Sequence, residues 1–147
     1  MFRLTVLAVG KLKNKPLSAL GEDYMGRLRR HGRLDLVEIK DSDPTVEGER
    51  LLAALKTRSD AILWALSEEG KTMRSVDLAK AVSERQGGEF VFVIGGPFGL
   101  VDDVKVQADR VFSLSPMTFT HEMARVLLLE QLYRAVSINT GSKYHHD

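Results

Sequence analysis

Residues 90–99 of the chain, FVFVIGGPFG, decide its fold. The first five, Phe90-Val91-Phe92-Val93-Ile94, are aromatic or β-branched and apolar at every position, which is typical of a central strand of a parallel sheet, buried on both faces. Gly95-Gly96-Pro97-Phe98-Gly99 follows without a break and predicts a loop at the carboxyl end of that strand. A buried strand that runs straight into such a loop indicates an α/β protein.

The segments on either side of this stretch alternate between strand and helix patterns. The expected strands cover residues 3–9, 34–39, 61–66, 90–94 and 111–114, and Glu68-Glu69-Gly70 is expected to close the third. The expected helices run from Pro16 to His31-Gly32, around Leu51 and Leu55, from Val76 to Val82, over 101–108, and for about 17 residues from the cap Thr120 to Ser137. This order predicts a mainly parallel sheet with helices on both faces, in one domain of residues 1–147. Ligands of such sheets bind outside the carboxyl ends of the strands.

The composition excludes several classes of protein. The chain is 44% hydrophobic, 28% charged and 7% aromatic, which is typical of an ordinary globular domain. It has no cysteine, so disulfides, thiolate metal sites and cysteine nucleophiles are excluded. No apolar run approaches the ~20 residues that a membrane helix needs, and the N-terminus has no signal core. We therefore expect a cytoplasmic protein without membrane contact.

The net charge of +1 hides an uneven distribution along the chain. Residues 1–40 contain nine lysines and arginines against four acidic residues. The basic residues of interest are Lys11, Lys13 and Lys15, followed by Arg27, Arg29, Arg30 and Arg33. One interpretation is a surface that faces nucleic-acid phosphates. The other is a solvated helix face with loop lysines, which charge alone favours because such clusters are common on protein surfaces.

Several common catalytic motifs are missing. The first expected strand ends in Gly10-Lys11, and the chain has neither Gly-x-Gly-x-x-Gly nor a P-loop, which argues against the usual nicotinamide and nucleoside-triphosphate sites. It has neither Gly-x-Ser-x-Gly nor His-Glu-x-x-His, so an α/β-hydrolase and a zinc protease have no support. The loops after the last two strands remain as candidate sites.

Those two loops can form the facing walls of a pocket. Residues 95–99 let a flat heterocycle approach the main chain closely, and the segment 114–119, with Leu66 at the end of the third strand, supplies an apolar wall with backbone hydrogen-bonding groups. A glycine-rich turn without a ligand is the alternative, and composition does not separate the two. Trp64, on the apolar face of the third strand, indicates core packing rather than base stacking.

Side chains suited to proton transfer or phosphate binding gather near the C-terminus. They are His121, Arg125, Arg134, Tyr144, His145 and His146. This group is consistent with a site that modifies a base or binds a phosphate. The alternatives are a polar helix start at His121, an i,i+4 pair between Glu130 and Arg134, and a frayed terminus at 145–147. Adjacent histidines usually point apart, so we expect no metal site.

Several strings of the chain have the order and spacing of one family. They are Ile94-Gly95-Gly96-Pro97-Phe98-Gly99-Leu100, Ser113-Leu114-Ser115-Pro116-Met117-Thr118-Phe119-Thr120-His121, Arg125-Val126-Leu127, Glu130-Gln131-Leu132-Tyr133-Arg134-Ala135 and Tyr144-His145. Together they resemble the RlmH family of SPOUT-class methyltransferases over essentially the whole chain. Two positions depart from that pattern: Thr120 stands where proline is common, and His146 follows the Tyr-His pair where a basic residue is common.

The resemblance implies an α/β fold whose C-terminal part is threaded into a trefoil knot, and it implies a homodimer. The implied cofactor is S-adenosylmethionine. Its expected contacts are Leu66, Gly95, Leu114, Ser115, Pro116, Met117, Thr118 and Phe119. The expected residues near the substrate are His121, Arg125, Tyr144 and His145, with the C-terminal tail coming from the partner subunit.

The implied reaction is methylation of N3 of a pseudouridine in 23S ribosomal RNA, in the large subunit or the whole ribosome after assembly. Methyl transfer from a sulfonium needs alignment but no metal and no protein nucleophile, which agrees with the missing motifs. The proton on N3 must leave, and His145 is the first candidate for the base, with Arg125 as an alternative electrostatic partner. The competing hypothesis is a non-catalytic RNA-binding or ribosome-associated module.

Overall fold

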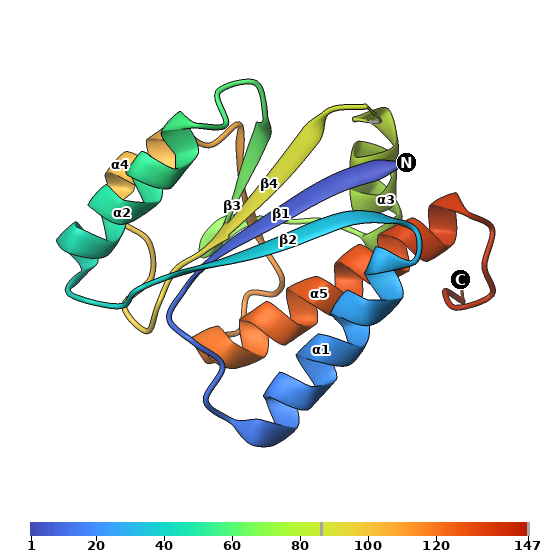
Figure 1. Ribbon diagram of the computed structural model, residues 1–147, viewed down its shortest axis with the longest axis horizontal. Helices are drawn as coiled ribbons and strands as arrows, with labels where there is room; N and C mark the ends of the chain where they lie inside the picture. Colours follow the sequence, from blue (N-terminus) through green and yellow to red (C-terminus); the bar gives the residue numbers. More distant parts are fainter. Residues whose placement is uncertain (86, 147) are drawn as a thin grey trace.

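The computed structural model describes residues 1–85 and 87–146. Its five strands form one sheet in the order β2-β1-β4-β3-β5, and all neighbouring strands are parallel. The strands are β1 (Phe2–Val9), β2 (Gly32–Ile39), β3 (Ile62–Thr72), β4 (Glu89–Ile94) and β5 (Arg110–Ser113), and the helices are α1 (Lys15–Arg29), α2 (Pro44–Lys56), α3 (Ser75–Glu84), α4 (Asp102–Gln107) and α5 (His121–Asn139). The predicted alternation is confirmed, and the FVFVI stretch forms the central strand (Figure 1).

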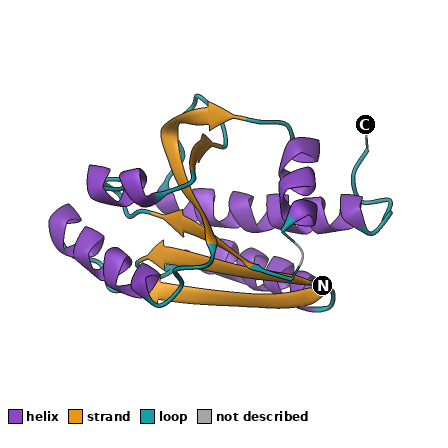
Figure 2. Cartoon of the chain, turned by 90° about the horizontal axis from the view of Figure 1, so that it is seen from above, coloured by secondary structure: helices purple, strands orange, loops and turns teal. Residues whose placement is uncertain are grey.

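Helices cover both faces of the sheet (Figures 1 and 2). On one face α5 contacts both α1 and α3, and on the other α2 contacts α4. Along β4, Phe90, Phe92 and Ile94 join the core beneath α1, α3 and α5, whereas Val91 and Val93 join the core beneath α2 and α4. Successive side chains of a strand point to opposite faces, so the run of apolar residues in β4 is explained by burial on both sides.

Trp64 belongs to an aromatic cluster in the larger of these cores. Its ring centroid lies 4.9 Å from that of Phe90, 6.1 Å from that of Phe92 and 5.5 Å from that of Phe112. Trp64 is 6% exposed. The prediction that Trp64 packs in the core is therefore confirmed, and the indole is not available to stack on a nucleic-acid base.

β3 is longer than the sequence predicts, because Glu68-Glu69-Gly70 does not end it. After a register shift the chain pairs with β5 again, so that Leu66 and Lys71 both lie opposite Phe112. A Cβ on Gly70 would lie 2.6 Å from the backbone of Phe112, so position 70 needs a glycine where β3 passes close to β5. The expectation of a turn was wrong because the pairing partner lies far away in the sequence.

α5 begins at the predicted cap and is the longest of the described helices. The Thr120 hydroxyl oxygen accepts a hydrogen bond from the Met123 N–H at 3.2 Å, as an N-cap residue does. Among the described residues, no helix combines the length and apolar character needed to cross a membrane. The trefoil knot implied by the resemblance stays a prediction.

The buried aromatic cluster makes a direct prediction about stability. We expect Phe92→Ala to lower the free energy of unfolding by about 3–5 kcal/mol, because the fully buried ring contacts Trp64, Phe90 and Phe112 and its loss leaves a cavity. Urea denaturation followed by the fluorescence of Trp64 measures the change. Phe98→Ala is the matched control, since Phe98 is 79% exposed, and an equal loss of stability in both variants would contradict the prediction.

Candidate active site

An open cleft lies at the carboxyl ends of β3, β4 and β5, where parallel sheets bind their ligands. Its volume is about 1100 Å³, and the starts of α1 and α5 complete its lining. Seven of the eight residues predicted to contact the cofactor line this cleft: Leu66, Gly95, Leu114, Ser115, Met117, Thr118 and Phe119. Pro116, the eighth, is not among the lining residues. The two loops that the sequence singles out therefore face one cleft.

The glycine loop after β4 presents main chain to the cleft. Gly96 and Gly99 form an isolated antiparallel bridge, in which the Gly99 N–H donates to the Gly96 carbonyl at 3.0 Å. Gly99 has φ +77°, a conformation that residues with a Cβ rarely adopt. A Cβ on Gly95 would lie 2.6 Å from the carbonyl carbon of Gly99. A side chain at position 95 would therefore force this tight turn open.

The opposite wall, residues 113–119, is held in shape by its own hydroxyl groups. The Ser113 hydroxyl donates to the Ser115 carbonyl at 2.6 Å, and the Ser115 hydroxyl accepts from the Met117 N–H at 3.0 Å. Thr118 donates to the Glu68 carboxylate and so ties this wall to the end of β3. Met117 and Phe119 remain 74% and 38% exposed. The wall is thus an ordered turn with an apolar surface.

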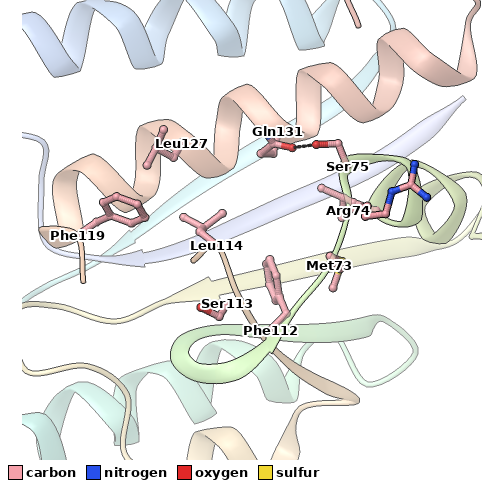
Figure 3. A pocket seen from close by; sticks show the side chains of 10 residues that line it. Met73, Arg74, Ser75, Phe112, Ser113, Leu114, Phe119, Leu127 and Gln131 are labelled. Carbon is pink, nitrogen blue, oxygen red and sulfur yellow. Dashed lines mark hydrogen bonds between the residues drawn. The ribbon is translucent and has the colours of Figure 1, made fainter. Parts of the chain in front are cut away.

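A smaller cavity of about 260 Å³ adjoins the cleft and shares Ser113, Leu114 and Phe119 with it (Figure 3). Its far side is formed by the start of α3 and the middle of α5. There the Ser75 hydroxyl donates to the Gln131 side-chain oxygen at 2.6 Å. The segment 113–119 therefore separates two cavities.

A buried carboxyl group lies behind the glycine loop. Glu47, in the first turn of α2, is 3% exposed. Its Oε2 accepts a hydrogen bond from the Ser42 N–H at 2.9 Å, whereas its Oε1 has no hydrogen-bond partner within the described part of the chain. A Cβ on Gly96 would lie 3.4 Å from Oε1. The sequence analysis missed Glu47, because no local pattern relates α2 to the loop after β4.

Arg125 is buried rather than presented to the cleft. It is 2% exposed, its Nη1 donates to the Glu38 carboxylate at 2.7 Å, and its Nη2 donates to the Gly10 carbonyl at 2.8 Å. The guanidinium therefore ties α5 to the carboxyl ends of β1 and β2. This geometry supports a positioning role and gives no support to the predicted contact with substrate. His121, one turn earlier, does line the cleft.

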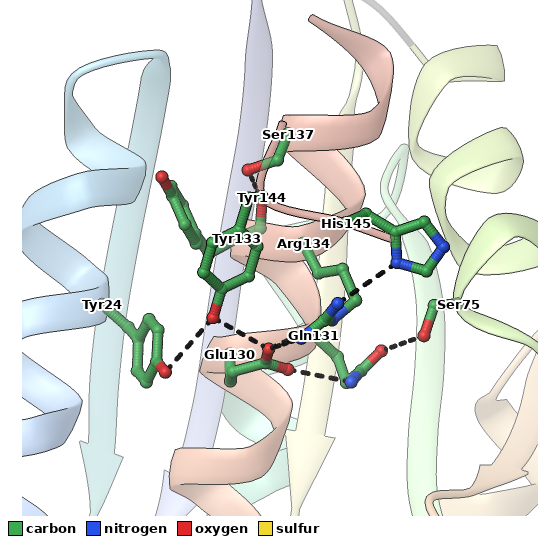
Figure 4. A network of polar contacts seen from close by, with 9 residues as sticks. All are labelled: Tyr24, Ser75, Glu130, Gln131, Tyr133, Arg134, Ser137, Tyr144 and His145. Carbon is green, nitrogen blue, oxygen red and sulfur yellow. Dashed lines mark hydrogen bonds and ion pairs between the residues drawn. The ribbon is translucent and has the colours of Figure 1, made fainter. Parts of the chain in front are cut away.

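The C-terminal tail lies against the second half of α5 (Figure 4). The Tyr144 hydroxyl donates to Glu130 Oε1 at 3.0 Å and lies 3.4 Å from the Tyr24 hydroxyl. His145 Nδ1 lies 3.2 Å from Arg134 Nη1. Burial, followed by these hydrogen bonds, raises the pKa of Tyr144, so its hydroxyl stays protonated at neutral pH. The alternative of a frayed terminus at 145–147 is therefore wrong for His145, while Asp147 lies outside the described residues.

The predicted i,i+4 pair on α5 is confirmed by the same network. Arg134 Nε and Nη2 donate to Glu130 Oε1 at 3.1 and 2.5 Å.

Arg134 is thirteen residues beyond His121, which at 1.5 Å per residue places their Cα atoms about 20 Å apart. His145 contacts Arg134, so it lies far along α5 from His121. The four residues predicted to lie near the substrate, His121, Arg125, Tyr144 and His145, are therefore not brought together within one chain.

Charged residues that the sequence analysis missed line the rim of the cleft. Glu68, Glu69 and Asp102 supply carboxylates, and Lys105 pairs with Glu69 at 3.0 Å. Among residues 1–85 and 87–146, no group of three His, Asp or Glu side chains is arranged to hold a metal ion. These rim residues lie on β3 and α4, which meet at the cleft only in the folded chain. No local sequence pattern therefore predicts them.

Relatives of known name match the chain along its length. Residues 2–145 match the family described as "Predicted SPOUT methyltransferase". Two relatives named "Ribosomal RNA large subunit methyltransferase H" come from Geotalea daltonii and Sorangium cellulosum. The first is 42% identical over 154 residues and the second 43% identical over 148, and each alignment covers 98% of this chain and 99% of the relative.

Solved structures share the fold at low sequence identity. A putative methylase family protein from Neisseria gonorrhoeae gives a TM-score of 0.58 at 12% identity, over 99% of this chain and 86% of that one. The SpoU methyltransferase AviRb from Streptomyces viridochromogenes, solved in complex with AdoMet, gives 0.51 at 14% identity, over 96% and 59%. The family match and the two close relatives confirm the resemblance in the motifs, and the chain belongs to the SPOUT methyltransferase family.

Proposed function

We propose that this protein transfers a methyl group from S-adenosylmethionine to N3 of a pseudouridine in large-subunit ribosomal RNA, as a homodimer that acts on assembled ribosomes in the cytoplasm. The observation that carries the proposal is the cleft at the carboxyl ends of the strands, walled by the family's two loops. The full-length relatives named as ribosomal RNA methyltransferases support the substrate class. They also favour an enzyme over a non-catalytic RNA-binding module.

The cleft fits S-adenosylmethionine in size and in chemistry. Its volume of about 1100 Å³ exceeds what a ligand of this size needs. The main chain of residues 95–99 and the apolar wall of 114–119 suit the flat adenine ring, and the carboxylates of Glu68, Glu69 and Asp102 suit the cationic methionine part. When bound, the cofactor supplies an electrophilic methyl group on a sulfonium.

The protein's own residues position the pseudouridine and accept the proton that leaves its N3. The pseudouridine N3 carries a proton that must leave during methyl transfer, and an imidazole accepts protons near neutral pH. His121 lines the cleft, and His145 lies on the tail beside Arg134. Tyr144, whose pKa is raised, acts in this scheme as a hydrogen-bond donor that positions the tail, because its hydroxyl is not available as a base.

The separation of the two histidines along α5 supports the homodimer. Within one chain His145 is held at Arg134, thirteen residues or about 20 Å along α5 from His121. Two copies related by a twofold axis exchange equivalent surfaces, so the tail of one subunit can complete the cleft of the other. Each active site then combines His121 of one subunit with Tyr144 and His145 of its partner.

The glycine loop gives a test of cofactor binding. We expect Gly95→Ala to weaken the affinity for S-adenosylmethionine at least about tenfold, because the new Cβ collides with Gly99 and opens the turn. Isothermal titration calorimetry measures the affinity. Gly26→Ala is the matched control, since an added Cβ there meets nothing within 4 Å on an exposed helix face. Wild-type affinity in Gly95→Ala would place the cofactor elsewhere.

Mixing two variants tests the shared active site, at an S-adenosylmethionine concentration that fills the wild-type cleft but leaves the Gly95→Ala cleft empty. We expect the double variant Tyr144→Ala/His145→Ala to bind the cofactor normally but to transfer no methyl group. When it is mixed with Gly95→Ala and the dimers re-form, the mixed dimers contain one intact cleft facing one intact tail, so activity returns to about one quarter of the wild-type value. Radioactive methyl transfer to ribosomes measures it. If the tail acted within its own chain, the mixture would stay inactive.

The substrate is tested on ribosomal RNA itself. We expect mass mapping of large-subunit RNA from cells that lack this protein to show one methyl group missing from a pseudouridine, and addition of the purified protein to those ribosomes to restore it. Free ribosomal RNA is the comparison, and we expect it to be methylated much more slowly because the folded subunit supplies part of the recognition. An unchanged methylation pattern would refute the proposed substrate.

A further inference from the structure

The loop between β1 and α1, together with the first residue of α1, carries three exposed lysines beside the cleft. Lys11, Lys13 and Lys15 are exposed, and no ion pair involves any of them in the part of the chain that the structure describes. We call residues 10–15 the lysine loop. Leu12, between the first two lysines, packs inward, since its Cδ1 lies 3.4 Å from the position of a Cβ on Gly21. The loop therefore half-buries its apolar residue and exposes its cations.

The backbone of the lysine loop is held at both ends by the start of α5. At its first residue, the Gly10 carbonyl accepts a hydrogen bond from Arg125 Nη2 at 2.8 Å. At its other end, Glu122 Oε1 accepts hydrogen bonds from the N–H groups of Lys13 at 2.5 Å and Asn14 at 3.0 Å. These bonds lower the pKa of Glu122, so the carboxylate stays ionised at neutral pH. The three cations are therefore carried on an ordered loop.

The same contacts place the lysine loop at the rim of the cleft. Asn14 and Leu17 line the cleft together with His121 and Glu122. Figure 1 shows the loop that follows β1 beside the first turn of α5. Three other carboxylates of the rim, those of Glu68, Glu69 and Asp102, lie on β3 and α4, and β4 separates β1 from β3 in the sheet, whereas the Glu122 carboxylate accepts hydrogen bonds from the lysine loop itself. The rim is thus basic beside α1 and acidic beside β3.

The arginines farther along the chain do not extend this basic surface. α1 has 15 residues, so its last turn lies about 22 Å from the lysine loop. There Arg27 pairs with Asp23 at 3.1 Å, Arg29 donates to the Leu34 carbonyl at 3.2 Å, and Arg33 pairs with Asp35 at 3.1 Å. These contacts favour the interpretation as a solvated surface for Arg27, Arg29 and Arg33, so the lysine loop is considered by itself.

We propose that the lysine loop binds the phosphates of the RNA strand next to the target nucleotide. This inference rests on the proposed function, because it takes RNA as the anion. Two features favour a nucleic-acid backbone: the exposed lysines occupy alternate positions of the sequence, and they flank Asn14, which lines the cleft that the target base must enter. A lysine is a compact cation that contacts phosphate without reading sequence. The lysine loop therefore strengthens binding and fixes the position of the RNA strand, while the cleft selects the target nucleotide.

The test compares two double variants with the same change in charge. Lys11→Ala/Lys13→Ala removes two cations from the lysine loop, and Lys56→Ala/Lys80→Ala removes two exposed cations that do not line the cleft. The probe is ribosomes from cells that lack this protein, titrated with labelled protein at several salt concentrations. We expect the loop variant to bind at least about tenfold more weakly at 0.1 M salt, and its log–log salt slope to be shallower by about 1.5. We expect the control to match the wild type.

Two further measurements separate this inference from the proposed function. Both double variants are expected to bind S-adenosylmethionine with wild-type affinity and, at saturating ribosome concentration, to keep most of the wild-type turnover. Equal ribosome affinity and equal salt slopes in the two double variants would overturn the role of the lysine loop, even if methyl transfer is intact. If wild-type protein binds ribosomes through these lysines but transfers no methyl group, the proposed reaction fails and the loop assignment stands.

Glu122→Ala tests whether the order of the loop matters as well as its charge. The substitution removes a negative charge from the rim, so charge alone predicts tighter binding to ribosomes. Loss of the two hydrogen bonds to Lys13 and Asn14 releases the loop, and we expect weaker binding, because the freed loop must be ordered when it binds. Tighter binding by Glu122→Ala would overturn the claim that the loop is preorganised.

Discussion

The buried guanidinium of Arg125 holds together the part of the molecule that carries the site. A buried charge is costly unless it is paired and hydrogen-bonded, and removal of one partner of such a pair typically costs ~3–5 kcal/mol. Here Glu38 on β2 and the Gly10 carbonyl after β1 satisfy two of its nitrogens. Because Arg125 lies in the second turn of α5, these bonds fix the helix that carries His121 and Glu122, and with them one wall of the cleft and the base of the lysine loop.

Main-chain groups and side chains have different roles in the site. The walls of the cleft are two turns, one shaped by glycine contacts and one by serine hydroxyls, and both present backbone groups. Side chains that can carry protons or bind phosphates lie outside these turns, on α5, on the tail and on the lysine loop. In the proposed reaction, cofactor binding and substrate binding therefore depend on different residues. A substitution in one set can leave the other intact.

Local sequence patterns predict most of the fold and part of the site. The FVFVI strand, the N-cap Thr120 of the long helix and the core position of Trp64 each depend on neighbouring residues, and all three are confirmed. The continuation of β3 and the burial of Arg125 depend on Phe112 and Glu38, which lie far away in the sequence. No local pattern encodes those partners. The acidic partners of Arg27 and Arg33 in the basic N-terminal third are likewise identified only once the chain is folded.

The return of β3 past Phe112 has a consequence for how the chain acquires its structure. The strand pairs of residues 67–72, Lys71 with Phe112 and Thr72 with Ser113, both depend on β5, which lies some forty residues later in the chain. Contacts between distant segments slow folding, since the intervening chain loses its freedom before the contact stabilises anything. We therefore expect the wall of the cleft, which the bond between Thr118 and Glu68 joins to β3, to form only after β5 has paired with β3.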